Sequence, residues 1–300
     1  MRANSTSAPA VAAQAYAGLL DYLELTKPSV VWLILMSTAV GFYVASPNGP
    51  LDYLLFLHTL LGTALLAGGT GALNQWMERY ADARMRRTEN RPLPAGRLRS
   101  LPALAFGLGI SLAGLIYLGA AVNLLSALLG LFTCASYLGL YTPLKTRTWL
   151  STLVGAFPGA MPPLIGWVAV RNSIGIDGWV LFAMLFLWQF PHFYAIAWMY
   201  REDYSRAGIL MLPVVEPDGI STGRQIVCFA ALLVPVSLMP AILGMAGAWY
   251  FAGALLLGLA YLYYGVLAAR FKTTVQARKL LQASIFYLPL IYVLLVVDRV

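Results

Sequence analysis

The sequence predicts an all-α polytopic membrane protein with nine transmembrane helices, and three observations lead to this prediction. The first is composition: 60% of the 300 residues are hydrophobic, 11% are charged, and the mean hydropathy is +0.74. Soluble domains carry about 25% charged residues. The second is a series of apolar windows, each long enough to cross a bilayer as a helix. They lie near 28–46, 54–79, 101–121, 123–142, 151–170, 178–199, 224–246, 248–269 and 280–298.

The third observation is the distribution of positive charge over the loops between these windows. Of the 20 Lys and Arg residues, all but Arg171 and Arg299 fall in alternate loops on one side of the expected bundle. Cytoplasmic loops of membrane proteins carry such an excess of Lys and Arg. We therefore expect a cytoplasmic N-terminus, an external C-terminus and an integral, multi-pass position in a membrane of the bacterial inner-membrane type.

The ends of the chain and its charge limit the domain organisation. Residues 1–25 lack the basic start and short apolar core of a cleavable signal peptide, so we expect a cytosolic arm over 1–25 and one transmembrane domain over 26–300. Acidic residues follow both the second and the sixth window, which indicates a 4+4+1 arrangement of helices, with coincidence as the alternative. The net charge of +8 does not indicate nucleic-acid binding, because the basic residues are scattered over membrane flanks.

One stretch at the end of the second window is far more polar than the rest of the chain. Asn74, Glu78 and Asp82 are spaced four residues apart, so on a helix they point to one side. We call these three residues the oxygen ladder. Two carboxylates and an amide suit Mg²⁺, which completes its shell with waters and substrate phosphates. Asn74 and Glu78 lie on the apolar side of the boundary, where polar groups are costly, and this favours a functional role.

Arginines follow the ladder within two helical turns. Arg84, Arg87 and Arg91 carry guanidinium groups, which bind phosphate oxygens through paired hydrogen bonds and keep their charge in most surroundings. Ladder and arginines together indicate a site for a metal-bound diphosphate. The alternative is a membrane boundary at which the arginines contact lipid headgroups.

Two further loops on the same side carry candidate groups. Glu202 and Asp203 could bring a second Mg²⁺ to the diphosphate, although neighbouring positions on a helix face different ways. Lys145 and Arg147 form a compact cationic loop that could close over the same anion. Lys27, at the start of the first window, is either another such cation or an interfacial anchor.

Two windows have unusual compositions. The sixth contains polar groups at membrane depth in the stretch 188–194, WQFPHFY, where His192 is either a hydrogen-bonded core residue or a functional one. The fifth is rich in Gly and Pro, which indicates either close helix packing or a break around a cavity.

These motifs resemble the UbiA superfamily of intramembrane prenyltransferases. Asn74-x3-Glu78-x3-Asp82 is similar to the first acidic motif of that superfamily, and MxRTxxRPL over 85–93 is similar to its protoheme IX farnesyltransferase (heme O synthase) branch. Further matches to this branch are LTKP at 25–28, YTPLK at 141–145, GAMPPLIGW at 159–167, WQFPHFYAIA at 188–197 and DYxxAGIxMLPV at 203–214.

The resemblance implies a nine-helix bundle and Mg²⁺-dependent transfer of farnesyl from farnesyl diphosphate to a vinyl group of heme B, with addition of water. Heme B is then a substrate, and the product heme O would pass to heme A synthase or into terminal oxidase assembly. The sequence departs from the pattern at three places. Glu78 stands where the superfamily usually has Asp, Tyr200 and Tyr204 stand in place of the second pair of acids, and Ser151 stands where the branch is expected to have Asn.

Residue chemistry and motif matches together assign four groups of candidate residues. The expected metal ligands are Asn74, Glu78, Asp82, Glu202 and Asp203. The expected diphosphate ligands are Lys27, Arg84, Arg87, Arg91, Lys145 and Arg147. The expected prenyl and heme pocket is Trp188, Gln189, Phe193, Tyr194 and Trp198. The expected catalytic residues are Asn74, Asp82, His192, Tyr200 and Asp203. For His192, contact with the heme iron and handling of the proton of the added water are both open.

Three other functions stay open on the sequence. A prenyltransferase for a quinone precursor would use the same ladder with a different acceptor. A transporter would use the acids for coupling ions, but it should also show polar groups in the outer half of the bilayer, which these windows lack. A non-catalytic heme carrier or oxidase assembly factor would bind heme without needing the ladder.

Overall fold

The computed structural model describes residues 18–300 and is built from helices. Nine membrane spans can be recognised in this part by length and composition. They are Pro28–Ala45 (α2), Tyr53–Asp82 (α3), Ser100–Ala121 (α4), Leu124–Leu144, Ser151–Arg171 (α7), Ile176–Met199 (α8), Ile220–Ile242 (α11), Ala248–Phe271 (α12) and Thr274–Val297 (α13). The only β pairing among the described residues is an isolated bridge between Ala246 and Arg299. The expected fold class is confirmed.

The fourth span changes its helical geometry along its length. It consists of Leu124–Ser136 (α5), a π-helical turn Tyr137–Tyr141 (η1) and Thr142–Leu144 (α6). Two short helices, Arg201–Arg206 (α9) and Leu212–Val215 (α10), follow α8. Of the expected N-terminal arm, residues 1–17 lie outside the described residues, and 18–25 form a short helix.

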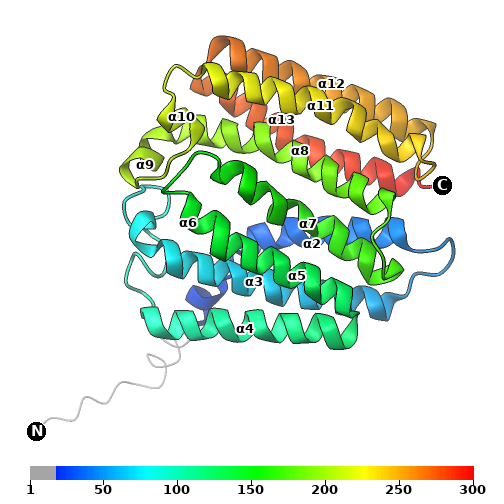
Figure 1. Ribbon diagram of the computed structural model, residues 1–300, viewed down its shortest axis with the longest axis horizontal. Helices are drawn as coiled ribbons and strands as arrows, with labels where there is room; N and C mark the ends of the chain where they lie inside the picture. The colour runs from blue at the N-terminus through cyan, green and yellow to red at the C-terminus, as the bar shows by residue number, and fades with distance from the viewer. Residues whose placement is uncertain (1–17) are drawn as a thin grey trace, which may run out of the picture.

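The spans lie side by side in a flattened bundle (Figure 1). From one edge to the other the order is α4, then α3 and α5, then α2 and α7, then α8 and α13, and finally α11 and α12. The connections after α3, α6, α8 and α12 emerge at one end of the bundle, on the left in Figure 1 and opposite the C-terminus. We call this end, formed by residues 83–99, 145–150, 200–219 and 272–273, the loop end.

The helices α7 and α8 form the centre of the bundle, and α7 packs closely against α2. A Cβ atom at Gly41 would lie 2.0 Å from the Pro163 carbonyl oxygen, and one at Gly166 would lie 2.0 Å from the Thr38 carbonyl oxygen. Only glycine permits this approach. The helix α7 is continuous through its three internal prolines, so close packing accounts for the Gly and Pro composition of this span.

The outward faces of the spans are apolar, which agrees with a lipid environment. Large exposed side chains occur on helices across the bundle, including Leu57, Leu108, Leu256 and Val293. A soluble domain rarely exposes apolar surface so continuously. One boundary matters for the site: α3 runs on to Asp82, beyond the expected end at 79, so the whole oxygen ladder lies on one helix.

Candidate active site

Each oxygen of the ladder is paired with a cation from a different segment of the chain. The pairs are Lys27 Nζ with Asn74 Oδ1 at 2.6 Å, Lys145 Nζ with Glu78 Oε1 at 2.7 Å, and Arg91 Nη1 with Asp82 Oδ2 at 2.7 Å. Every expected metal ligand on α3 is therefore in contact with an expected diphosphate ligand. We call these six residues the paired cluster.

Lys27 reaches Asn74 because the turn before α2 is held against α3. Gln75 Nε2 donates hydrogen bonds to the carbonyl oxygens of Glu24 and Leu25, both at 3.1 Å. The backbone of Lys27 is in the left-handed conformation, with φ 54° and ψ 63°. This conformation costs a residue with a Cβ atom about 1–3 kcal/mol. Burial lowers the pKa of Lys27 to about 8, and the nearby Arg91 acts in the same direction.

The π-helical turn orients the Asn74 amide. Asn74 Nδ2 donates to Thr142 Oγ1 at 3.1 Å, and that hydroxyl donates to the Tyr137 carbonyl oxygen at 2.9 Å. Because the amide nitrogen is occupied by Thr142, the amide oxygen faces Lys27. Such π turns inside α-helices occur frequently at functional sites.

Lys145 lies against an aromatic ring as well as against Glu78. Its Nζ is 4.5 Å from the centre of the Tyr141 ring. Burial disfavours the charge on Lys145, but Tyr141 and Glu78 outweigh burial and hold the pKa of Lys145 well above its usual value. Gly155 leaves room for this arrangement, since a Cβ atom there would lie 2.5 Å from the Tyr141 ring.

The loop after α3 folds back over the end of the helix. Thr88 Oγ1 donates to the Asp82 carbonyl oxygen at 2.8 Å, and Arg91 reaches the Asp82 side chain, of which 2% is exposed. Further along, Arg97 pairs with Asp21 and Glu24 of the helix at 18–25. This loop therefore connects the ladder to the turn that carries Lys27.

The second acidic segment has different surroundings from the oxygen ladder. Glu202 is exposed, and Asp203 pairs with Arg206 on the next turn of α9. Among residues 18–300 there is no group of three His, Cys, Asp or Glu side chains that could hold a metal ion, and this holds for Glu78 and Asp82 as well as for Glu202 and Asp203. Asp203 is drawn to its local partner because Arg206 lies on the same face of a short helix.

The remaining expected diphosphate ligands are all exposed and differ in their contacts. Arg84 and Arg147 are exposed at the loop end. Arg87 is also exposed, but it contacts the rings of Tyr200 and Tyr204. The structure thus brings three of the six expected diphosphate ligands to the ladder and joins a fourth, Arg87, to the second segment.

The expected pocket residues on α8 point in several directions. Trp188 and His192 stack at 4.7 Å and face α13, where Trp188 Nε1 donates to the Ser284 carbonyl oxygen at 3.0 Å and His192 Nδ1 lies 2.7 Å from Ser284 Oγ. Gln189 faces α7 and donates to the Ala156 carbonyl oxygen at 3.1 Å. On a third side, Tyr194 donates to Gln225 of α11. Phe193 is half-buried.

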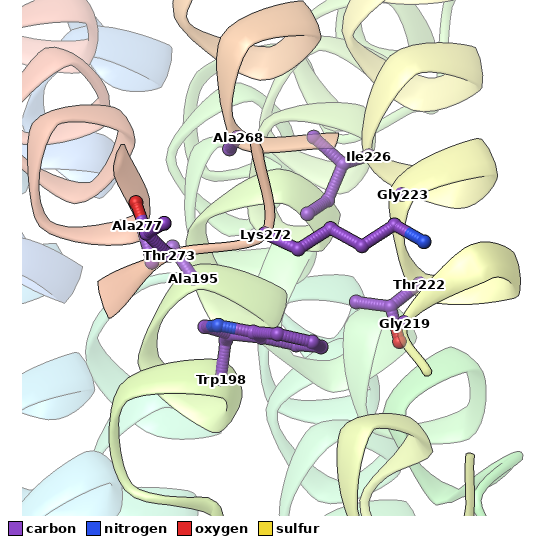
Figure 2. Close-up of a pocket in the computed structure, with 10 residues that line it drawn as sticks. All are labelled: Ala195, Trp198, Gly219, Thr222, Gly223, Ile226, Ala268, Lys272, Thr273 and Ala277. Carbon is purple, nitrogen blue, oxygen red and sulfur yellow. The ribbon is translucent and has the colours of Figure 1, made fainter. Parts of the chain in front are cut away.

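Trp198 lies in a separate pocket at the loop end, shown in Figure 2. Its ring lies across the floor of the pocket, and Lys272 extends along the opposite wall toward Gly223. A Cβ atom at Gly219 would lie 2.4 Å from the Trp198 ring. Among the expected site residues, only Trp198 lines this pocket in the described part of the chain, so Trp198 belongs to the interface of α8, α11, α12 and α13 and not to the paired cluster.

Several supporting residues were missed by the sequence argument. Thr142 and Tyr141 lie within the quoted YTPLK stretch, so a motif signal for them existed. Gln75 and Ser284 gave no signal. Gln75 was not noticed because the spacing of the ladder drew attention to its neighbour Asn74. Ser284 was not noticed because it is a single small polar residue in an apolar window.

Comparison with known proteins agrees with this fold. The family model described as the UbiA prenyltransferase family matches residues 34–290. A relative named protoheme IX farnesyltransferase, from Solibacter usitatus, is 58% identical over 93% of this chain and 98% of its own. A second relative with that name, from Koribacter versatilis, is 47% identical over 94% of each chain.

Solved structures share the fold at low sequence identity. A UbiA homolog from Archaeoglobus fulgidus, bound to GPP and Mg²⁺, superimposes with a TM-score of 0.65 at 18% identity, covering 92% of this chain and 99% of that one. The family match over most of the sequence and the identity to curated relatives identify the chain: it belongs to the UbiA prenyltransferase family, within its protoheme IX farnesyltransferase branch.

Proposed function

We propose that this chain transfers a farnesyl group from farnesyl diphosphate to a vinyl group of heme B, with Mg²⁺ and addition of water, giving heme O and diphosphate. The observation that carries this proposal is the paired cluster, in which each of three oxygen ligands contacts a cation next to the loop end. The choice of heme B as acceptor is supported by the name of the relatives that are 58% and 47% identical.

The donor set of the ladder fits Mg²⁺. Two carboxylates and one amide oxygen are hard ligands, and they leave positions that waters and phosphate oxygens can fill. The solved UbiA homolog that binds GPP and Mg²⁺ has the same fold, which supports a metal-bound diphosphate here. When bound, Mg²⁺ would stabilise negative charge on the leaving diphosphate.

The cations of the paired cluster would bind the diphosphate. Lys27, Lys145 and Arg91 come from three segments, so they can approach the phosphate oxygens from different sides. Fixed cations aimed at the oxygens on which charge develops are usually the largest contribution to such a step. Arg84, Arg87 and Arg147 would add positive potential at the mouth of the site.

The reaction forms one C–C bond and breaks one C–O bond. The diphosphate leaves with the electron pair of the C–O bond, and the vinyl electron pair of heme attacks the allylic carbon. Water then adds to the carbon next to the porphyrin ring and loses a proton. The ring faces of Phe193 and Tyr200 would stabilise the allylic cation, whereas Trp188, Gln189, Tyr194 and Trp198 pack against neighbouring helices and support the site from there. His192 either contacts the heme iron or accepts the proton.

The proposal also gives the protein a place in the cell. We place it in a bacterial inner membrane with the loop end in the cytoplasm, because all Lys and Arg residues except Arg171 and Arg299 fall on this side of the expected bundle. Heme O would pass from it to heme A synthase or to a terminal oxidase during assembly.

The test is incubation of the purified protein with heme B, farnesyl diphosphate and Mg²⁺, followed by mass analysis of the extracted heme. We expect heme that has gained one farnesyl and one hydroxyl group, and loss of this product when EDTA removes the metal. A parallel reaction with an aromatic acid tests a quinone precursor as acceptor. Prenylated aromatic acid without heme O would contradict the proposal, and heme that binds but returns unchanged would indicate a carrier.

A further inference from the structure

Arg87 lies against two aromatic rings of the second acidic segment. Its guanidinium carbon lies 5.1 Å from the centre of the Tyr200 ring and 5.6 Å from that of the Tyr204 ring. Its Nη2 donates to the Tyr204 hydroxyl at 3.2 Å. The Tyr204 amide donates to the Tyr200 carbonyl oxygen at 3.0 Å, so the two rings lie one helical turn apart on the same face.

The segment that carries Arg87 packs against the second acidic segment, and that segment is in turn bonded to the loop that carries Lys145. Met85, two residues earlier, is buried with Ala197 and Ile209 in a small apolar cluster between the two segments. The Leu210 amide donates to the Lys145 carbonyl oxygen at 2.8 Å, which joins the second segment to the loop that pairs with Glu78. Arg87 therefore belongs to the same assembly of loops as the paired cluster.

Among the described residues, the acids of the second segment make no ion pair with the first segment. Asp203 is paired with Arg206, and Glu202 is exposed to solvent. The side chains that face the first segment are instead the two tyrosines, and they contact a cation. A second metal ion beside the tyrosines would be repelled by Arg87, which already supplies a positive charge there.

We propose that Tyr200 and Tyr204 are positioning residues that hold Arg87 against the substrate diphosphate, and that this protein binds one divalent metal ion per diphosphate. This inference rests on the proposed function, since it names how the same site holds its diphosphate. A guanidinium group can take the role because it offers five N–H donors and stays charged, and because aromatic faces fix its plane.

The first experiment counts metal ions without any reaction. Full-length protein is mixed with Mn²⁺ and an unreactive farnesyl diphosphate analogue with a bridging sulfur atom, and bound Mn²⁺ is counted by electron paramagnetic resonance. We expect one Mn²⁺ per chain, dependent on the analogue. Two Mn²⁺ ions per chain would overturn the inference.

The second experiment separates binding from turnover in four variants. Arg87→Gln removes charge-assisted hydrogen bonds, so we expect the KM for farnesyl diphosphate to rise about tenfold or more. Tyr200→Leu should raise that KM about threefold through loss of the ring, and Tyr200→Phe, which keeps the ring, should restore it. Arg86→Gln is the matched control, because it removes the same charge from the neighbouring exposed residue.

The outcomes distinguish this inference from the proposed function. Equal KM values for Arg87→Gln and Arg86→Gln, with heme O still formed by the unmodified protein, would defeat the inference alone. Equal KM values for Tyr200→Leu and Tyr200→Phe would defeat the positioning role. Failure of the unmodified protein to form heme O would defeat the proposed function, whatever the number of metal ions.

Discussion

The two acidic segments at the loop end carry similar residue types but differ in what surrounds them. In the first, Asn74 and Asp82 are buried, and they pair with Lys27 before α2 and with Arg91 of the loop after α3. In the second, Glu202 is exposed and Asp203 is paired within its own helical turn. A site for a metal-bound diphosphate needs oxygen ligands for the metal and cations for the phosphates in one place, and acidity in the sequence alone does not show this.

The largest expected effect is at the buried end of the first segment. Asp82→Asn keeps the shape of the side chain and removes its charge, so we expect heme O formation to fall on the order of a thousandfold. Activity is measured by mass analysis of extracted heme, and size-exclusion chromatography in detergent confirms that the variant is folded. Near-normal turnover by a folded Asp82→Asn variant would place the metal elsewhere.

The pair between Lys145 and Glu78 should be important for stability as well as activity. Lys145→Gln leaves the Glu78 carboxylate buried without its partner, which typically costs about 3–5 kcal/mol. The double variant Lys145→Gln/Glu78→Gln should regain most of the thermal stability but no activity.

Thermal unfolding in detergent is the measurement for this pair, and Lys279→Gln, at an exposed lysine, is the control. A single variant Lys145→Gln as stable as the control would show that the pair does not contribute to the fold.

A smaller effect is expected at Gly155, which leaves room for the Tyr141 ring beside Lys145. In Gly155→Ala the new methyl group would lie 2.5 Å from the Tyr141 ring, so that ring must shift and its contact with Lys145 must change. Overpacking of this kind costs about 1–3 kcal/mol.

We expect a lower thermal midpoint and a higher KM for farnesyl diphosphate in Gly155→Ala. Gly139→Ala, in the π-helical turn but with no atom within 4 Å of the new Cβ, is the control. Identical behaviour of the two variants would argue against a role for the Tyr141 position.

The smallest effect is expected in the second segment. Glu202→Gln removes an exposed charge without a buried partner, so activity should stay within about twofold of the unmodified protein. Steady-state rates at saturating Mg²⁺ are sufficient to measure this. A loss as large as that of Asp82→Asn would make the two segments equivalent.

Much of the fold and part of the site could be predicted from the sequence, because their signals are local. The nine windows depend on length and hydropathy alone, and the ladder depends on a spacing of four residues on one helix. The pairing of Lys27 with Asn74 joins positions 47 residues apart, and no pattern along the chain indicates such a contact.

The α8 aromatics show why a contiguous motif can mislead. Trp188, Gln189 and Tyr194 are near neighbours in the sequence, and the motif suggested one shared pocket. Each step along a helix turns about 100°, so these side chains reach α13, α7 and α11 separately. The π-helical turn at Tyr137–Tyr141 and the hydrogen bond from Asn74 to Thr142 beside it were not predicted either, because that bond joins two helices far apart in the sequence.

The left-handed backbone at Lys27 has a consequence for protein engineering. Glycine or asparagine adopts φ 54° at little cost, so a search for more heat-resistant sequences would favour either residue at this position. The resulting protein would gain robustness and lose the ammonium group that meets Asn74. Position 27 is thus a place where selection for durability and selection for turnover would choose different amino acids.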